Sequence, residues 1–197
     1  MAELGTGSAV FGTTIKKWSV GAPLQSVLDS VAVLLDDPGV RADNIRHIRV
    51  DMPTASMRIV DNSTIPDLCV QHLVALMIVD RGASFAAVHD AARMTDPKVL
   101  AVRKLVELVP SEELQTAVPV RQAIVRIDTA DGRSLNHRTY VVRGTARNPM
   151  DAKEIEAKAL DLMAPVLGAE RARELIAAIG NLERLGPVSG LRRLLQA

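Results

Sequence analysis

The residues best placed to do chemistry lie in one stretch, 13–29, which reads TTIKKWSVGAPLQSVLD. Lys16 and Lys17 precede Pro23, and a proline at a first helical position predicts a helix that begins there. The free N–H groups of such an N-terminus carry partial positive charge, so the turn at Gly21 and the two lysines could together bind a carboxylate. Solvated lysines and an ordinary core tryptophan would explain the same residues, and residue types alone favour that simpler interpretation.

A second candidate is His72, which lies in the apolar segment 67–79. Apolar residues occupy nearly every side of the helix predicted there, a pattern typical of a helix inside a structure. His72 and Gln71 would then be buried or would line a cavity. Because buried polar groups are normally paired within the core, the pattern favours a structural role for His72 over a ligand contact. No histidine or cysteine has metal-ligand spacing, so we expect no metal and no cofactor.

Composition argues against several classes of function. The chain has 197 residues, of which 24 are basic and 23 acidic, and only 2% are aromatic. A basic patch with stacking aromatics is therefore unsupported, and we expect no nucleic-acid partner. Cys69 is the single cysteine, which favours a reducing compartment. The chain does not begin with a basic region and an apolar run, and its longest apolar stretch, 65–79, is shorter than the roughly 20 residues of a membrane span. We expect a soluble, cytoplasmic protein with no membrane partner.

The periodicity of apolar residues predicts an α+β fold, in which helices pack on a small, mainly antiparallel sheet. The expected elements are helices over 24–35, 67–79 and 98–103, and strands over 45–52 and 105–110. The strongest hairpin signal joins strands 120–129 and 134–143 through Ala130-Asp131-Gly132. A three-residue loop with glycine in the left-handed position places Ile127 opposite Leu135, and we prefer it to a two-residue Asp-Gly turn.

A boundary is predicted at residues 144–149, after which the pattern is wholly helical. Asp151, with Glu154 three residues later, predicts a helix start, and Pro165 and Gly168 are expected to end that helix. Because about fifty residues in three short helices seldom form a core of their own, this tail is expected to pack on another structure. The expected domains are a linker-like N-terminus (1–12), an α+β lid-type domain (13–145) and a helical tail (146–197).

Four stretches of the chain follow the order of a known family. They are IKKWSVGAPLQSVLDS at 15–30, IPDLCVQHLVALMIVDRG at 65–82, TADGRSLNHRTYVVRGTARNPMDAKEIEAKALDLMAPVLG at 129–168, and the end rich in leucine and isoleucine. Through them the chain resembles the C-terminal part of the MmgE/PrpD family, which includes 2-methylcitrate dehydratase, cis-aconitate decarboxylase and iminodisuccinate epimerase relatives. The resemblance covers nearly the whole chain, from Leu4 to Leu195.

The resemblance implies a two-domain enzyme with a large helical domain, a smaller α+β lid and an active site between them. This chain would supply the lid and the last helices. A separate N-terminal helical-domain polypeptide, or self-association as a homodimer, would complete the protein. Family substrates are small di- and tricarboxylates, and the reactions begin by removing a proton α to a carboxylate. The resemblance thus implies part of a carbon–oxygen lyase or an isomerase that is not active alone.

The resemblance also suggests site residues. The lysine of the family that enters the first lid helix corresponds to Lys16, with Lys17 as the alternative register, so Lys16 is the catalytic candidate. The candidates for substrate binding are Lys17, Gly21, Gln25 and His72. In dehydratase- and decarboxylase-type members a histidine follows this lysine, and residues 19–25 contain none. That departure counts against assigning either reaction to this chain, and the other catalytic groups would belong to the helical domain.

Two further interpretations remain open. The missing histidine and the missing half would also fit a non-catalytic module that binds small acids or self-associates. A nucleotide-binding enzyme is less well supported, because Gly5-Thr6-Gly7 lacks the further glycines of a phosphate loop and no strand precedes it.

Overall fold

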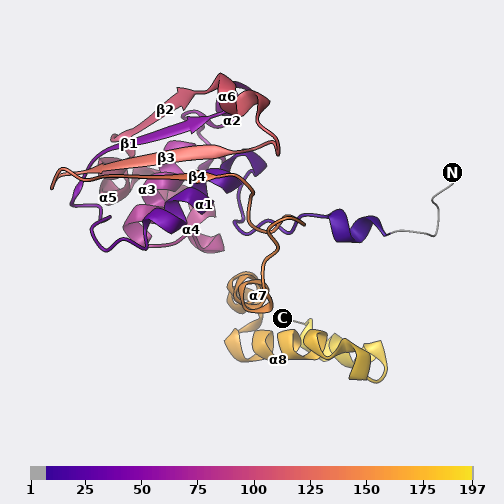
Figure 1. The fold of residues 1–197 in the computed structure, drawn as a ribbon. Helices are drawn as coiled ribbons and strands as arrows, with labels where there is room; N and C mark the ends of the chain where they lie inside the picture. Colours follow the sequence, from indigo (N-terminus) through magenta and orange to yellow (C-terminus); the bar gives the residue numbers. More distant parts are fainter. Residues whose placement is uncertain (1–7, 197) are drawn as a thin grey trace, which may run out of the picture. The chain divides into compact units, whose positions relative to one another are not determined.

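The structure is a computed structural model that describes residues 8–196. It contains two compact units, Met1–Pro149 and Met150–Ala197 (Figure 1). Residues 1–7 of the expected linker lie outside the described residues, and Ala9–Gly12 forms a 3-10 turn (η1). Within residues 8–196, no helix has the length and apolar character needed to cross a membrane.

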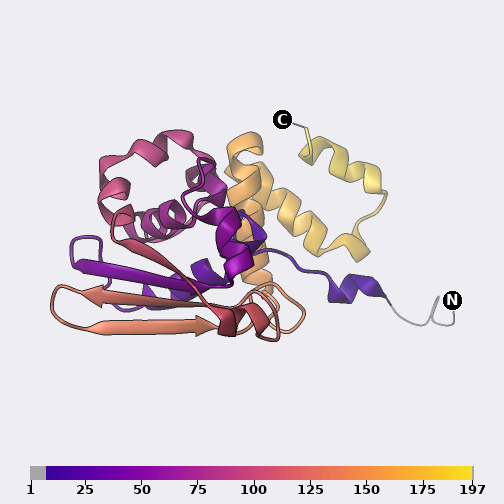
Figure 2. The ribbon, with the colours of Figure 1, turned by 90° about the horizontal axis from the view of Figure 1, so that it is seen from above.

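The first unit is built on a four-stranded sheet in the order β2-β1-β3-β4 (Figure 2). Its strands are β1 (Ile45–Met52), β2 (Val106–Pro110), β3 (Ala123–Thr129) and β4 (Ser134–Thr139). The pairs β1–β3 and β3–β4 are antiparallel, whereas β1 and β2 are parallel. The sheet is therefore mixed, because the helical segment after β1 carries the chain back before β2 begins. The predicted α+β fold is confirmed.

The hairpin of β3 and β4 forms with the predicted register. Ile127 pairs with Leu135, and Gly132 takes a φ of 85° in the loop between the strands. β3 begins later than the predicted strand 120–129, because Arg121 adopts a left-handed φ of 69° and interrupts the extended backbone.

Two helices, α1 (Gln25–Leu34) and α3 (Val70–Asp80), form the core of the helical layer on one face of the sheet (Figure 1). Strand side chains alternate between the faces, so Ile48 and Val50 of β1 are buried while Arg49 between them is partly exposed. The shorter helices are α2 (Thr54–Val60), α4 (Phe85–His89), α5 (Pro97–Arg103) and α6 (Glu112–Thr116). The 3-10 turns of this unit after η1 are η2 (Ala22–Leu24), η3 (Pro66–Leu68) and η4 (Ala91–Thr95).

Helix α3 is the most buried element of the first unit. Every residue from Val70 to Ile78 is buried, as the sequence predicts for a helix that is apolar on nearly all sides. The helix begins at Val70 rather than at residue 67, because Pro66–Leu68 form a separate 3-10 turn. Each fully buried leucine here contributes about 1.5–3 kcal/mol through removal of its surface from water.

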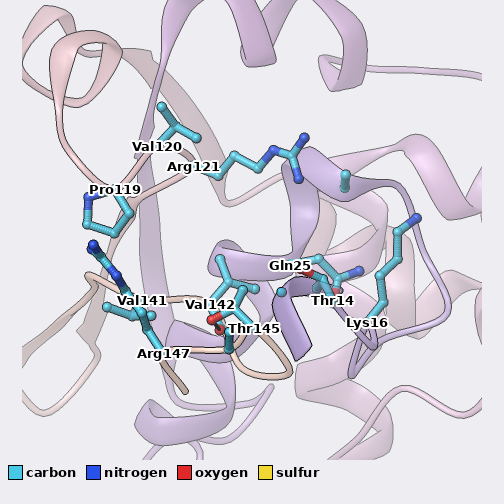
Figure 3. A pocket seen from close by; sticks show the side chains of 13 residues that line it. Thr14, Lys16, Gln25, Pro119, Val120, Arg121, Val141, Val142, Thr145 and Arg147 are labelled. Carbon is cyan, nitrogen blue, oxygen red and sulfur yellow. Dashed lines mark hydrogen bonds between the residues drawn. The ribbon is translucent and has the colours of Figure 1, made fainter. Parts of the chain in front are cut away.

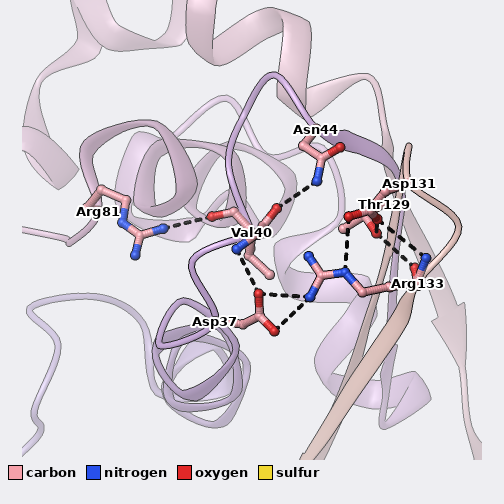
Figure 4. Close-up of polar contacts among 8 residues, drawn as sticks. Asp37, Val40, Asn44, Arg81, Thr129, Asp131 and Arg133 are labelled. Carbon is pink, nitrogen blue, oxygen red and sulfur yellow. Dashed lines mark hydrogen bonds and ion pairs between the residues drawn. The ribbon is translucent and has the colours of Figure 1, made fainter.

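A set of polar contacts ties the hairpin loop to the end of α1 (Figure 4). Arg133 Nη1 lies 2.9 Å from Asp37 Oδ2, and its Nε lies 3.1 Å from Asp131 Oδ2. The Thr129 hydroxyl donates to the Asp131 carboxylate, and together with Arg133 it lowers the pKa of Asp131 to about 2. Arg81 reaches the same region and donates to the carbonyl oxygen of Val40 over 2.7 Å. These contacts fix the loop end of the sheet against the helical layer.

The second unit contains α7 (Ala152–Leu167), α8 (Ala169–Gly180) and the 3-10 turns η5 (Leu182–Arg184) and η6 (Val188–Leu194). Its small buried cluster consists of Leu175, Leu191 and Leu194. None of the residues of α7 is buried. The predicted helix start is present as a complete capping box, in which Asp151 accepts from the Glu154 N–H and Glu154 accepts from the Asp151 N–H.

The predicted end of this helix at Gly168 is confirmed, whereas Pro165 lies inside the helix and does not end it. Proline lacks one N–H group, so near the end of a helix it removes a single hydrogen bond and the helical backbone can continue. Helix α7 runs on to Leu167 and ends at Gly168, which has a φ of 81°.

Candidate functional site

The segment that carries Lys16 is fixed to helix α1 by the side chain of Gln25. The Trp18 N–H donates to Gln25 Oε1 over 3.2 Å. Gln25 Nε2 in turn donates to the carbonyl oxygens of Trp18 and Val20, over 2.9 and 3.3 Å. Gln25 is buried, so these three hydrogen bonds also satisfy an amide that would otherwise be costly to remove from water. The backbone of residues 18–20 is therefore held in one position relative to α1.

Asp29 adds a second connection. Its Oδ1 accepts from the Trp18 indole N–H over 2.8 Å, and its Oδ2 accepts from the Arg143 N–H over 2.8 Å. Burial raises the pKa of the Asp29 carboxyl above its ordinary value, although the hydrogen bonds from Arg143 and Trp18 favour the charged form. One carboxylate thus joins the lysine segment, helix α1 and the chain that follows β4.

A close backbone approach completes the arrangement. The Ile15 N–H donates to the carbonyl oxygen of Gly144 over 2.9 Å, and Gly144 has a φ of 91°. A Cβ atom at Gly144 would lie 1.8 Å from the carbonyl oxygen of Ile15. Both the conformation and the space therefore require glycine. The residue that immediately precedes Lys16 is held against the turn after β4.

The lysine segment that these contacts hold lines a pocket of ≈ 360 Å³ in the first unit, together with Gln25 (Figure 3). Thr14, Lys16 and Gln25 lie on one side of the close-up, and Pro119, Val141 and Arg147 lie on the other. The remaining lining residues are Gly12, Ala22, Val120, Arg121, Val142, Thr145 and Ala146. The pocket therefore joins the lysine segment to the loop before β3 and to the turn after β4.

Positive charge dominates the ionisable groups of this pocket. Lys16, Arg121 and Arg147 line it, and no aspartate, glutamate or histidine is among its described lining residues. Lys16 is exposed, and its Nζ donates to the carbonyl oxygen of Val20 over 3.2 Å. This bond holds the ammonium group near the start of η2 and leaves it two further N–H donors. The arrangement can accept an anion with several oxygen atoms.

Three of the predicted site residues, Lys17, Gly21 and His72, do not line this pocket. Lys17 lines a different hollow of ≈ 430 Å³, and its Nζ lies 5.0 Å from the centre of the Trp18 ring. Gly21 packs closely, because a Cβ atom there would lie 2.5 Å from Leu68 Cδ2. The Gly21 N–H donates to the carbonyl oxygen of Asp67 over 3.2 Å. The N–H group of Gly21 is therefore used within the protein, and substrate binding at Gly21 stays a prediction.

His72 lies in helix α3 and is not among the residues that line this pocket. Its side chain is fully buried, and neither ring nitrogen has a hydrogen-bond partner among residues 8–196. Burial, with the positive charges of Arg103 and Arg93, lowers the pKa of His72 to about 4. The imidazole is therefore neutral near pH 7. A ligand contact of His72 stays a prediction.

No sequence pattern pointed to Arg121 or Arg147 as site residues. They are more than one hundred residues from Lys16, and they fall in the predicted strand 120–129 and in the predicted boundary 144–149. A cation in a loop is usually solvated, so only the tertiary structure shows that these three charges share one pocket. Among the described residues, no group of three or more His, Cys, Asp or Glu side chains could hold a metal ion.

Comparison with known proteins places these observations in a family. The MmgE/PrpD C-terminal domain matches residues 18–184. The match begins at Trp18, so Gln25, Asp29, Arg121 and the turn after β4 lie within it and Lys16 lies just before it. No curated protein matches the chain. Because the matched region spans most of its residues, the chain belongs to the MmgE/PrpD family and carries that family's C-terminal domain.

Proposed function

We propose that this chain is the lid half of an MmgE/PrpD-type lyase or isomerase that acts on small di- or tricarboxylates. The observation that carries the proposal is the pocket of Lys16, which is lined by cations and by no acidic side chain among the described residues. A molecule with several carboxylate groups fits such a pocket. Its negative charges would offset the mutual repulsion of the cations, and its oxygen atoms would accept hydrogen bonds from their N–H groups.

The proposed reaction begins with loss of a proton from the carbon next to a substrate carboxylate. Negative charge then spreads onto the carboxylate oxygens, and the Lys16 ammonium would stabilise it. The hydrogen bond from Lys16 to Val20 keeps this ammonium in place before substrate arrives, which avoids reorganisation during the reaction. The described lining of the pocket contains no histidine, aspartate or glutamate, so the general base in this proposal comes from a partner polypeptide.

The second unit supports the need for a partner. Helix α7 has no buried residue, and even its apolar side chains are exposed: Ile155 is 40% exposed and Val166 is 67% exposed. A hollow of ≈ 450 Å³ in this unit has an almost wholly apolar lining that includes Ile155, Met163 and Ile179. Apolar surface of this kind is typical of a protein–protein contact. In the proposal its occupant is the N-terminal helical-domain polypeptide of the family.

The test is to purify the chain with and without such a polypeptide and to measure both samples by native mass spectrometry. Turnover of 2-methylcitrate, cis-aconitate and iminodisuccinate is then assayed. We expect a complex that turns over one of these acids, and a loss of at least about a hundredfold in kcat/KM for Lys16→Ala with the complex intact. Lys104→Ala is the matched control, because Lys104 is exposed and does not line the pocket.

The partner contact has its own variant pair. Ile179→Glu, in the apolar hollow, should prevent the complex, whereas Ile59→Glu should not. Ile179 and Ile59 are 52% and 59% exposed, and Ile59 lies in α2 of the other unit. A chain that forms only homodimers and shows no turnover with any partner would support the non-catalytic module and contradict the proposed enzyme.

A further inference from the structure

We infer that Arg121 and Arg147 select polycarboxylates, each by binding a carboxylate other than the one that Lys16 contacts. The inference rests on the proposed function for its choice of ligand, and it concerns two residues to which the reaction assigns no role. Both arginines line the pocket of Lys16. Arg147 lies across the close-up from Lys16, with its side chain directed toward Pro119, whereas the side chain of Arg121 extends from the loop before β3 toward the side of Lys16 (Figure 3).

Neither arginine has a protein partner for its charge. Neither Arg121 nor Arg147 forms an ion pair or a side-chain hydrogen bond with any residue of 8–196. Other arginines of the same unit do have carboxylate partners, such as Arg133 with Asp37 and Arg49 with Asp51. The guanidinium groups in the pocket therefore keep their paired N–H donors available, and this geometry matches the two oxygens of a carboxylate.

The loop that carries Arg121 is held in place by hydrogen bonds. Gln122 is 3% exposed, and its Nε2 donates to the carbonyl oxygen of Pro119 over 3.0 Å. Its Oε1 accepts from Arg138 Nε over 3.0 Å, and Arg138 is itself paired with Glu113 at 2.5 Å. This chain of contacts holds Arg121 at a φ of 69°, a conformation that costs a residue with a side chain some free energy. Such strain is often found at residues with a function.

The turn of Arg147 is equally well fixed. The Asn148 side chain donates to the carbonyl oxygen of Val141 over 3.0 Å and accepts from Arg143 Nη1 over 2.7 Å. The Thr145 hydroxyl donates to the carbonyl oxygen of Val142 over 2.8 Å. Arg147 lies between these two anchored residues, so its backbone position does not depend on a ligand. Both arginines thus start from fixed backbones, which reduces the entropy lost when a ligand binds.

The three cations of this pocket imply a rule of selection. A monocarboxylate could bind one of these cations, but not all three at once. A molecule with several carboxylates could bind more than one cation, and each added charge-assisted hydrogen bond would strengthen its binding. Arg121 and Arg147 should therefore contribute to the binding of tricarboxylates and little to that of monocarboxylates.

The experiment measures binding to the full chain by isothermal titration calorimetry, with tricarballylate and propionate as unreactive probes. We expect tricarballylate to bind with a Kd below about 1 mM, and Arg121→Gln and Arg147→Gln each to weaken it by about tenfold to a hundredfold. Propionate binding should change less than about twofold in both variants, whereas Lys16→Ala should weaken both ligands. Arg121→Gly removes the side chain but suits the left-handed backbone, so it should bind like Arg121→Gln if the loop is intact.

Arg126→Gln is the matched control. Arg126 is exposed on β3 outside the pocket, so Arg126→Gln removes the same charge without changing any of the proposed carboxylate contacts. Equal losses in Arg126→Gln and Arg121→Gln, equal losses for both ligands, or no saturable tricarballylate binding would each overturn the inference. Failure of the proposed function looks different, because the chain would bind tricarballylate through these arginines and yet no complex would turn over an acid.

Discussion

The two units of this chain differ in how far they bury the apolar residues of their longest helices. Helix α3 of the first unit is buried continuously from Val70 to Ile78, whereas the 16 residues of α7 in the second unit include none that is buried. Helix α7 also has five charged residues among its 16, against one among the 11 of α3, but its apolar Ile155 and Val166 stay exposed as well. The first unit supplies its own covering surfaces for α3, and the second unit lacks them for α7. The first should therefore be stable by itself, and the second should gain stability from a partner.

The largest effect is expected from a pair of glycines, one in each unit. Gly144→Ala places a Cβ atom 1.8 Å from a backbone oxygen at a φ of 91°, so the backbone must move. We expect a loss of at least about 4 kcal/mol in the free energy of unfolding of the first unit. Gly168→Ala has a similar φ of 81° but meets no atom within 4 Å, so it should cost only about 1–3 kcal/mol, within the second unit.

Urea denaturation separates the two glycine variants. Fluorescence of Trp18, the only tryptophan of the chain, reports on the first unit, and far-ultraviolet circular dichroism reports on both units. Equal shifts of the Trp18 transition in Gly144→Ala and Gly168→Ala would show that the two units unfold together.

A leucine pair sharpens the comparison of the two cores. Leu73→Ala in α3 should cost about 4 kcal/mol, because the residue is fully buried in a closely packed layer. Leu175→Ala in α8, where the buried cluster is small, should cost about 2 kcal/mol because its surroundings can collapse more easily. The same denaturation curves provide the measurement. A larger cost for Leu175 than for Leu73 would mean that the second unit has a core comparable to the first.

Acid should weaken the first unit through His72. Its pKa of about 4 lies below the value near 6.5 of an unfolded chain, so between these pH values the unfolded state binds a proton that the folded state excludes. The stability of the first unit should therefore fall as the pH drops from about 6.5 to 4, by up to roughly 3 kcal/mol. The second unit contains no histidine and should show no such slope.

His72→Leu provides the check, since leucine removes both the titrating group and the unpartnered ring nitrogens. Stability measured at several pH values by Trp18 fluorescence should become flatter in this variant. If wild type and His72→Leu show the same slope, another group is responsible for the acid sensitivity.

The smallest effect is expected at a helix cap. Asp151→Ala removes the capping box of α7 and should cost about 1 kcal/mol, which would appear as lost helicity because burial contributes little to this helix. Asp96→Ala removes the equivalent hydrogen bond at α5, where buried Val99 and Val102 also hold the helix. Its loss of helicity should be smaller. Circular dichroism of the two variants at equal temperature compares them directly.

Sequence patterns predicted the elements whose signals are local. The three-residue loop Ala130-Asp131-Gly132 predicted the register of Ile127 with Leu135, and the apolar pattern of α3 indicated its burial. Helices α2 and α6 were missed, because seven and five residues carry too little periodicity to be distinguished from a loop.

Only one side of the pocket, the segment of Lys16, could be predicted from the sequence. Lys16 stands in a recognisable segment, and the helix after it follows from Pro23. Arg121 and Arg147 reach the pocket because the sheet brings the loop before β3 and the turn after β4 beside that segment. No local pattern contains this information, because it depends on strand order and on the glycine at 144.

The contact between Ile15 and Gly144 also has a consequence for the order of folding. It joins parts of the chain more than one hundred residues apart, so it can form only after the intervening sheet and helices have closed that long loop. The pocket of Lys16 is then expected to be among the last features of the first unit to form. A carboxylate ligand would bind only the finished domain, and its presence would slow unfolding without speeding the early steps of folding.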